Sequence, residues 1–325
     1  MEDIAMFSYK HTRGKGFWGG KELLVAAAVF AVVFSSGSAY AKVVQKTFPS
    51  PEKAVEALVE AVKADDIQSL VAIFGPGSRH LILSGDPVED EKGRDWFVKH
   101  YEEKNRLEEA SGKVTLHVGS DDWPLPIPIV KAGNGWRFDT AAGKREILAR
   151  RVGRNELNAI QVCLAYVDAQ KEYAMKKARQ GEDLLEYAQK FVSTPGKQDG
   201  LYWETGEGQE QSPIGPLFAA ARDQGYGRKP LGEESEPYHG YFYRILTAQG
   251  KNAPRGAQDY VVGGKMIGGF ALIAYPAHYR ASGVMTFIVN HDGVVYQKNL
   301  GKTTQKAAQA VKAFDPDKTW TRVPE

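Results

Sequence analysis

Histidines and cysteine are the first residue types to examine for metal chemistry. Of the seven histidines, those beyond residue 41 are His80, His100, His117, His239, His278 and His291. No two of them have the His-x-x-x-His or His-Glu-x-x-His spacing that places two imidazoles on one helix face. The one cysteine, Cys163, excludes the paired thiolates of the usual zinc sites. The sequence therefore predicts no metal site and no cofactor.

One histidine has acidic neighbours. His117, Asp121 and Asp122 lie close together in the sequence and could bind a cation. The same residues fit a strand that ends in an acidic turn, and we prefer that interpretation. His291 stands beside Asp292 and is expected to be exposed to solvent.

The nucleophiles and acids lack a recognisable catalytic pattern. No serine lies in a Gly-x-Ser-x-Gly elbow. Gly263-Gly264-Lys265 is too short for a phosphate-binding loop. Carboxylates are scattered through residues 193–237, at Glu204, Glu207, Glu210, Glu233, Glu234 and Glu236. A glycosidase-like pair among them stays open, but a solvated loop is the default interpretation. We predict no catalytic residue.

The densest group of polar and aromatic residues comprises Tyr238, His239, Tyr241, Tyr243 and Arg244. In a strand, alternation puts Tyr241 and Tyr243 on one face and Arg244 on the other. One face should belong to the core. The other could offer tyrosine hydroxyls or a guanidinium to an acidic or sugar ligand. These five residues are the candidate ligand site, and the alternative is that they only fill a sheet.

The elements that would position this group lie between residues 237 and 301. Three runs rich in aromatic and β-branched residues are separated by Gly, Pro, Asn and Asp, which is typical of an antiparallel sheet. Asp292-Gly293 between apolar runs predicts a type I′ hairpin turn. A final helix is expected from about residue 303 to 314.

Helices are expected first in the part of the chain that precedes this sheet. Residues 51–64 and 67–74 have helical apolar spacing. Ser50 before Pro51 fits an N-cap and a first helical position, and Asp66 fits the cap of the next helix.

A charged stretch, 88–109, should form a further helix. Its core candidates are Trp96, Phe97, Tyr101 and Leu107. Strands are expected at residues 113–118, 125–130 and 136–139, with a turn at 133–135.

The longest helical pattern covers residues 141–180. Gly153 is expected to divide it, and Asn155 to cap the second part. Residues 184–192 should continue as helix. Cys163 stands among apolar residues at helical spacing, which predicts a buried thiol.

The N-terminus predicts export. Basic residues precede an apolar run at 23–34, and small residues follow up to Ala41. This order is typical of a secretory signal peptide, cleaved after Ala41, and it predicts a periplasmic protein of a Gram-negative bacterium. The run is short for a membrane span, although a retained anchor stays open. No later segment predicts a span, and the near balance of 42 basic and 40 acidic residues predicts no nucleic-acid partner.

Three strings resemble a known family. They are residues 154–173, 240–250 and 283–301, and they are similar to the bacterial exported family called domain of unknown function 2950. The resemblance covers nearly the whole chain after the signal and implies an exported protein without assigned catalytic residues. In addition, residues 54–74 with 133–139 resemble the nuclear-transport-factor-2-like fold. The long helix with the later sheet resembles the globular part of pilin-like proteins, except that here an intervening domain precedes that helix.

These patterns together predict a two-domain α+β protein. A helical and curved-sheet domain should cover residues 48–142, and a long helix with an antiparallel sheet should cover residues 143–325. The expected function is a non-catalytic periplasmic binding or interaction module, whose partner is an unidentified envelope protein or small ligand. The alternative is a small-molecule binder or hydrolase that uses a pocket in the first domain.

Overall fold

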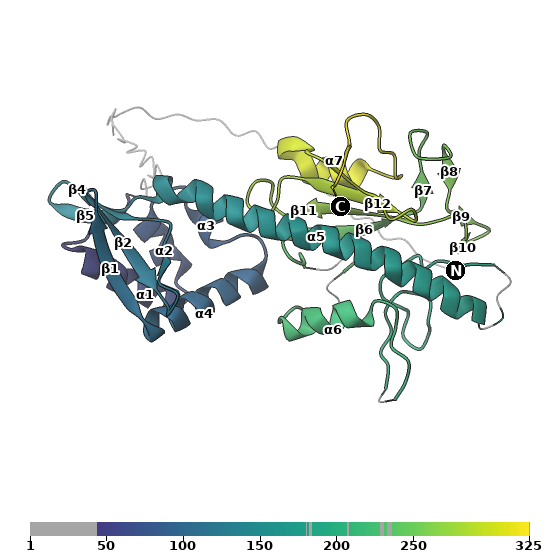
Figure 1. Cartoon of the computed structure of the whole chain (residues 1–325), viewed down its shortest axis with the longest axis horizontal. Helices are drawn as coiled ribbons and strands as arrows, with labels where there is room; N and C mark the ends of the chain where they lie inside the picture. Colours follow the sequence, from purple (N-terminus) through teal and green to yellow (C-terminus); the bar gives the residue numbers. More distant parts are fainter. Residues whose placement is uncertain are drawn as a thin grey trace, which may run out of the picture. The chain divides into compact units, whose positions relative to one another are not determined.

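The computed structural model describes residues 44–179, 181, 184–206, 208–227, 231–232 and 236–324 (Figure 1). Over these residues the chain is an α+β protein with antiparallel sheets, as predicted. The predicted signal peptide and its cleavage site lie outside the described residues. None of the described helices is both long and apolar enough to cross a membrane.

The first part of the chain consists of short helices and a small sheet. The helices are α1 (Pro51–Lys63), α2 (Ile67–Phe74), α3 (Arg79–Ile82) and α4 (Pro87–Glu103). The strands are β1 (Asn105–Ala110), β2 (Lys113–Val118), β3 (Trp123–Pro124), β4 (Ile129–Ala132) and β5 (Gly135–Phe138). The sheet order is β1-β2-β4-β5, and β3 also pairs with β2.

The predicted helix starts in this part are confirmed. The Ser50 hydroxyl accepts a hydrogen bond from the Lys53 backbone N–H, and the Asp66 carboxylate accepts one from the N–H of Ser69. Both bonds satisfy donors that a helix N-terminus leaves without an intrahelical partner.

The prediction of one helix over residues 88–109 is wrong at its end. Helix α4 stops at Glu103, and the next residues form β1, which pairs with β2 along its whole length. The reason is the Ser111-Gly112 turn, whose φ angles of 54° and 73° bring the two strands back together. Of the core candidates Phe97 is buried, whereas Trp96 is 40% exposed.

Helix α5 (Thr140–Arg179) is one continuous helix of 40 residues, so the predicted break at Gly153 is wrong. A glycine inside a helix costs only about 1 kcal/mol relative to alanine, which tertiary packing can outweigh. Asn155 does not cap a helix. It is buried, and its side-chain amide donates to the backbone carbonyl of Ser282 at 3.0 Å.

The predicted continuation of helix over residues 184–192 is also wrong. Gly181 has a φ of 94°, a left-handed conformation that suits the residue after a helix. Residues 184–192 contain bends and isolated bridges in place of a helix, and Tyr187 forms an antiparallel bridge with Met266. A further short helix, α6 (Gly215–Asp223), lies within residues 193–237.

The second sheet has the order β14-β13-β12-β11-β6. Its strands are β6 (Tyr241–Leu246), β11 (Ala271–Pro276), β12 (Thr286–Asn290), β13 (Val295–Lys298) and β14 (Thr321–Arg322). Two small ribbons stand apart from it, made by β7 (Ala248–Gln249) with β8 (Gln258–Asp259) and by β9 (Val261–Val262) with β10 (Lys265–Met266). Helix α5 contacts β11, β12 and β13.

The C-terminal helix is shorter than predicted. A 3₁₀ turn, η1 (Gly301–Thr303), leads into α7 (Thr304–Ala310), which contacts β11. The chain leaves the helix at Val311 in an extended conformation, and Phe314 is buried beyond the helix end.

The predicted type I′ turn at Asp292-Gly293 is not formed. Five residues separate the paired residues Val289 and Val295, and among them only Gly293 has a positive φ. Two-residue turns with positive φ at both positions occur instead at Ser111-Gly112, His239-Gly240 and Gly263-Gly264.

The described residues from Val44 onward belong to one compact unit that contains two apolar cores. The first core joins α1, α2, α4 and the first sheet, and Ile147 of α5 packs against it. The second joins the later part of α5 with the second sheet, α6 and α7. The predicted domain border at residue 142 falls within the first turn of α5, and the division into two domains stays a prediction.

Cys163 lies in the second core and is fully buried, as predicted. Burial raises the pKa of its thiol to about 12. The thiolate is the reactive form of cysteine, so this residue is chemically inert in the folded protein.

Candidate functional site

The five predicted site residues do not share one surface. Tyr241 and Tyr243 are buried in the second core, on the face of β6 that meets α5 near Cys163. The Tyr241 hydroxyl donates to the backbone carbonyl of Met285 at 2.9 Å. Both side chains therefore fill the sheet.

Arg244 lies on the opposite face of β6, as alternation predicts. Its Nη2 donates to the backbone carbonyls of Ala308 and Val311, at 2.9 and 2.7 Å. These carbonyls belong to the end of α7, where a helix leaves acceptors without partners. Arg244 thus holds α7 onto the sheet.

Tyr238 and His239 lie instead at the turn that enters β6. His239 has a φ of 51° and Gly240 of 73°, and Tyr238 and Tyr241 bond to each other through their backbones across them. The ring of Tyr238 packs against those of Tyr226 and His239.

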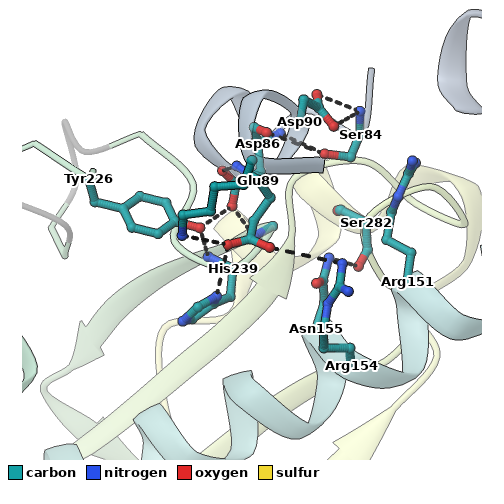
Figure 2. A network of polar contacts seen from close by, with 12 residues as sticks. Ser84, Asp86, Glu89, Asp90, Arg151, Arg154, Asn155, Tyr226, His239 and Ser282 are labelled. Atoms are coloured by element: carbon teal, nitrogen blue, oxygen red, sulfur yellow. Dashed lines mark hydrogen bonds and ion pairs between the residues drawn. The ribbon is translucent and has the colours of Figure 1, made fainter. Parts of the chain in front are cut away.

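The turn binds a buried carboxylate from the first part of the chain. Oδ2 of Asp86 accepts hydrogen bonds from the Tyr226 hydroxyl at 2.7 Å and from the Gly240 backbone N–H at 2.8 Å (Figure 2). Oδ1 of Asp86 accepts from the N–H of Glu89 and so caps α4. Asp86 is fully buried, and burial raises the pKa of its carboxyl although the three donors oppose this.

Charged groups surround the other side of the turn. The Nδ1 atom of His239 lies 4.0 Å from a carboxylate oxygen of Glu89, and Arg154 approaches the second oxygen of Glu89 at 3.9 Å (Figure 2). Burial lowers the pKa of His239, with Lys92 and Arg154 adding to the effect and Glu89 opposing it. Because its pKa is lowered, the His239 imidazole is mainly neutral near pH 7. Burial also raises the pKa of the neighbouring Tyr238 hydroxyl to about 12.

Helix α5 extends the same junction. Besides the bond of Asn155 to Ser282, an oxygen of Glu156 accepts from the backbone N–H groups of Val284 and Met285 at 2.9 and 3.0 Å. Arg151 donates to the last carbonyls of α3. Side chains of α5 thus bond to α3 on one side of the junction and to residues 282–285 on the other.

A groove of about 1050 Å³ opens next to this junction. Its walls come from α3, the start of α4, the loop after β11 and the beginning of α7. The walls meet where Gly85 touches His278, because a Cβ at Gly85 would come within 1.8 Å of a ring carbon. The basic and imidazole side chains that line it are Arg79, His80, Arg94, His278, Lys302 and Lys306.

The charge of the groove is largely uncompensated. Asp90 is the carboxylate among the lining residues, and both of its oxygens accept from the Ser84 backbone N–H at 3.0 and 2.8 Å. Arg79, Lys302 and Lys306 form no ion pair with any carboxylate of the described chain. A concave surface of this kind attracts anions.

The other candidate groups have structural roles. His117 does not bind a cation with Asp122, because the guanidinium of Arg106 occupies that place and donates to the Asp122 carboxylate. Within the described ranges, no three His, Cys, Asp or Glu side chains are grouped so that they could hold a metal ion. His291 is half-buried against the rings of Tyr260 and Phe270, so its predicted exposure is wrong.

Ser282, which lies four residues after the groove residue His278, also has a structural role. Ser282 is buried, and its hydroxyl bonds to the backbone N–H and carbonyl of His278 rather than to the imidazole. It therefore has no base to activate it. Of the loop carboxylates, Glu207, Glu233 and Glu234 lie outside the described residues, whereas Glu204 lines a separate shallow hollow with Trp203.

Comparison with known proteins identifies the family and no nearer relative. No curated protein matches the chain. No solved structure matches it, so the nuclear-transport-factor-2-like and pilin-like resemblances stay predictions. Residues 45–323 match the family described as "Protein of unknown function (DUF2950)". This match includes both cores, the Asp86 junction and the basic groove, and the chain belongs to that family.

Proposed function

We propose that this protein is a non-catalytic binding protein of the periplasm that holds a small anionic molecule in the basic groove. The observation that carries the proposal is the groove itself, in which the cations of Arg79, Arg94, Lys302 and Lys306 face one carboxylate that is already bonded to backbone. Cationic side chains in a concave, partly dry site bind anions more strongly than the same charges on an open surface.

Binding is favoured over hydrolysis by the chemistry of the lining. The Asp90 carboxylate in the lining and the Ser282 hydroxyl next to it are both bonded to backbone, so neither is paired with a His80 or His278 imidazole. Lysine and arginine ammonium and guanidinium groups suit recognition of a phosphate or carboxylate.

The proposal also includes export to the periplasm and a nuclear-transport-factor-2-like fold for the first part of the chain. The order of basic, apolar and small residues before Lys42 supports a cleaved signal peptide. Helices α1 and α2 packed beside a short antiparallel sheet support the nuclear-transport-factor-2-like interpretation of residues 48–142. The intact mass of protein recovered from the periplasmic fraction tests the signal, and a chain that begins before Lys42 would contradict cleavage.

Native mass spectrometry of protein purified from its own periplasm tests the bound anion. The expected result is a retained mass that disappears on denaturation. Replacing Lys302 and Lys306 together by Gln should remove that mass, because it takes away two groove cations. Replacing Lys99 and Lys113 by Gln is the matched control, since both are exposed and neither lines the groove.

Two results would count against this proposal. The first is a clean mass for the native protein together with no detectable binding of added inorganic phosphate or short carboxylates. The second is a retained mass that survives the Lys302 and Lys306 replacements. A protein partner captured reproducibly by crosslinking in the first case would favour an interaction module instead.

A further inference from the structure

We propose that the anionic ligand is a single-chain amphiphile, whose head group lies in the basic groove and whose apolar tail enters a second hollow inside the first core. The inference rests on the proposed function, since it names the class of molecule that the same groove would take. It is carried by the position and lining of that second hollow and by one nitrogen of Arg94 that has no hydrogen-bond partner in the described part of the chain.

The second hollow has a volume of about 270 Å³ and lies among α1, α2, α3, α4 and the start of α5. Most of its walls are aliphatic or aromatic, and they include Val62, Leu70, Phe74, Ile82, Leu125 and Ile147. The apolar walls offer water few hydrogen-bond partners, whereas Ser84, Glu89, Arg154 and Asn155 belong to the polar remainder of the lining. An alkyl chain would regain the dispersion contacts that an empty hollow forfeits.

The two hollows adjoin along α4. Asp90 and Arg94 line both of them, so a molecule that follows α4 can occupy the groove and the apolar hollow at once. The head group would then lie at Arg94 and the tail beyond it.

Arg94 has a donor available at this boundary. Its Nε pairs with the carboxylate of Asp65 at 2.9 Å, whereas its Nη1 is buried with no hydrogen-bond partner in the described part of the chain. A buried guanidinium donor without an acceptor is costly. A turn of the Arg94 side chain towards the mouth of the hollow would give this donor a carboxylate or phosphate oxygen as its acceptor, in a charge-assisted bond.

Arg151, which also lines the second hollow, has no terminal nitrogen that lacks an acceptor. Both terminal nitrogens of Arg151 already donate to the carbonyls of His80 and Leu81, at 2.9 and 2.6 Å. The geometry therefore assigns the head group to Arg94, with Lys302 of η1 and Lys306 of α7 among the residues that line the adjoining groove. A carboxylate and a phosphate fit this site alike, and the two head-group series below distinguish them.

Calorimetric titration with two series of probes tests the inference. The probes are straight-chain carboxylates and alkyl phosphates of two to twelve carbons, kept below their micelle concentrations, with inorganic phosphate as the chainless reference. Affinity should rise about fourfold per methylene, the factor that corresponds to burying one CH₂. The rise should stop at roughly nine carbons, since the hollow holds about nine groups the size of a water molecule.

Variants with a larger side chain in the hollow should distinguish binding of the tail from binding of the head group. Val62→Phe in α1 or Ile82→Phe in α3, each of which narrows the hollow, should abolish the rise in affinity with chain length and leave binding of inorganic phosphate unchanged. Thermal unfolding checks that each variant folds, and either one alone suffices for the test. Arg94→Gln should weaken all probes at least tenfold, whereas Lys99→Gln on the same helix should not.

The outcomes distinguish this inference from the proposed function. If inorganic phosphate and short probes bind but affinity does not depend on chain length, the amphiphile is wrong and the anion-binding groove stands. A rise with chain length that persists in both filled variants places the tail elsewhere and also overturns the inference. If no probe of any length binds, the proposed function itself fails.

Discussion

Two polar clusters of this protein contain the same kinds of group in different surroundings. At the junction, Asp86 lies with His239 and Arg154 nearby. On the first sheet, Asp122 lies with His117 and Arg106. The junction carboxylate is buried and bonded to neutral donors, and burial raises its pKa. The sheet carboxylate is bonded to a guanidinium, which lowers its pKa to about 2.

The difference shows what each cluster contributes. A buried carboxylate held by neutral donors is costly to disturb, because its partners lose their only acceptors. An exposed ion pair is screened by water and contributes little. The same residue types therefore hold the two cores together at the Asp86 junction but form only a surface ion pair at Asp122.

Removing the junction carboxylate should have the largest effect. Asp86→Ala leaves the Tyr226 hydroxyl and the Gly240 N–H without acceptors and removes the cap of α4. Urea unfolding should show a loss of roughly 3–5 kcal/mol. Asp122→Asn is the matched change on the first sheet and should stay near the error of the measurement. Equal losses in the two variants would break the comparison.

Gly240→Ala should come next. The φ of 73° is unfavourable for alanine, and its Cβ would lie 2.7 Å from Nδ2 of Asn155 and 2.9 Å from Cβ of Ser282. Strain and crowding together should cost about 2–4 kcal/mol. Gly112→Ala has the same φ with no atom within 4 Å, so it should cost only about 1–2 kcal/mol. If both replacements cost the same, the close packing of the junction is not what Gly240 provides.

His239→Asn should change the pH dependence of stability. The pKa of His239 is lower in the folded than in the unfolded protein, so the unfolded chain takes up its proton first as the pH falls. The native protein should thus lose stability below about pH 6.5, the ordinary value for histidine. The variant should lose less, and asparagine tolerates the positive φ at this turn. Unfolding curves at pH 5 and 8 measure the difference, and parallel profiles would refute it.

The smallest effect is expected on the first sheet. Arg106→Gln removes the hydrogen bonds that hold the pKa of Asp122 at about 2, so that pKa should move up towards its ordinary value of about 3.9. Any stability from the pair is present above the ordinary value and is lost as the pH falls through the lower one. Carboxyl NMR titration of Asp122 in both proteins measures the shift. An unchanged pKa would mean that Lys104 and His117 hold it instead.

Local signals in the sequence predicted local structure well. Ser50-Pro51 and Asp66 identified the starts of α1 and α2 because a cap and its helix are neighbours in the chain. The alternation of Tyr241 and Tyr243 against Arg244 was also readable, since it follows from strand geometry. Which face would be core, and that Arg244 would hold α7, depended on elements more than sixty residues away.

The junction could not be predicted in the same way. Asp86-Pro87 carries the same cap signal as Ser50-Pro51, but Asp86 and Gly240 stand 154 positions apart. Arg94 looked like one of many charges on a charged helix, and only tertiary packing leaves its Nη1 buried. The Ser111-Gly112 turn was not predicted, because the charged residues before it have a pattern that is typical of a helix.

The unbroken helix α5 has a consequence for how the protein unfolds. It extends about 60 Å at 1.5 Å per residue, and its early part packs on the first core while its later part packs on the second. If one core melted, the part of α5 that it supports would be left in water as a short helix of marginal stability. The two cores should therefore melt together, so that the calorimetric and van 't Hoff enthalpies agree. A shared helix makes one cooperative unit out of two hydrophobic centres.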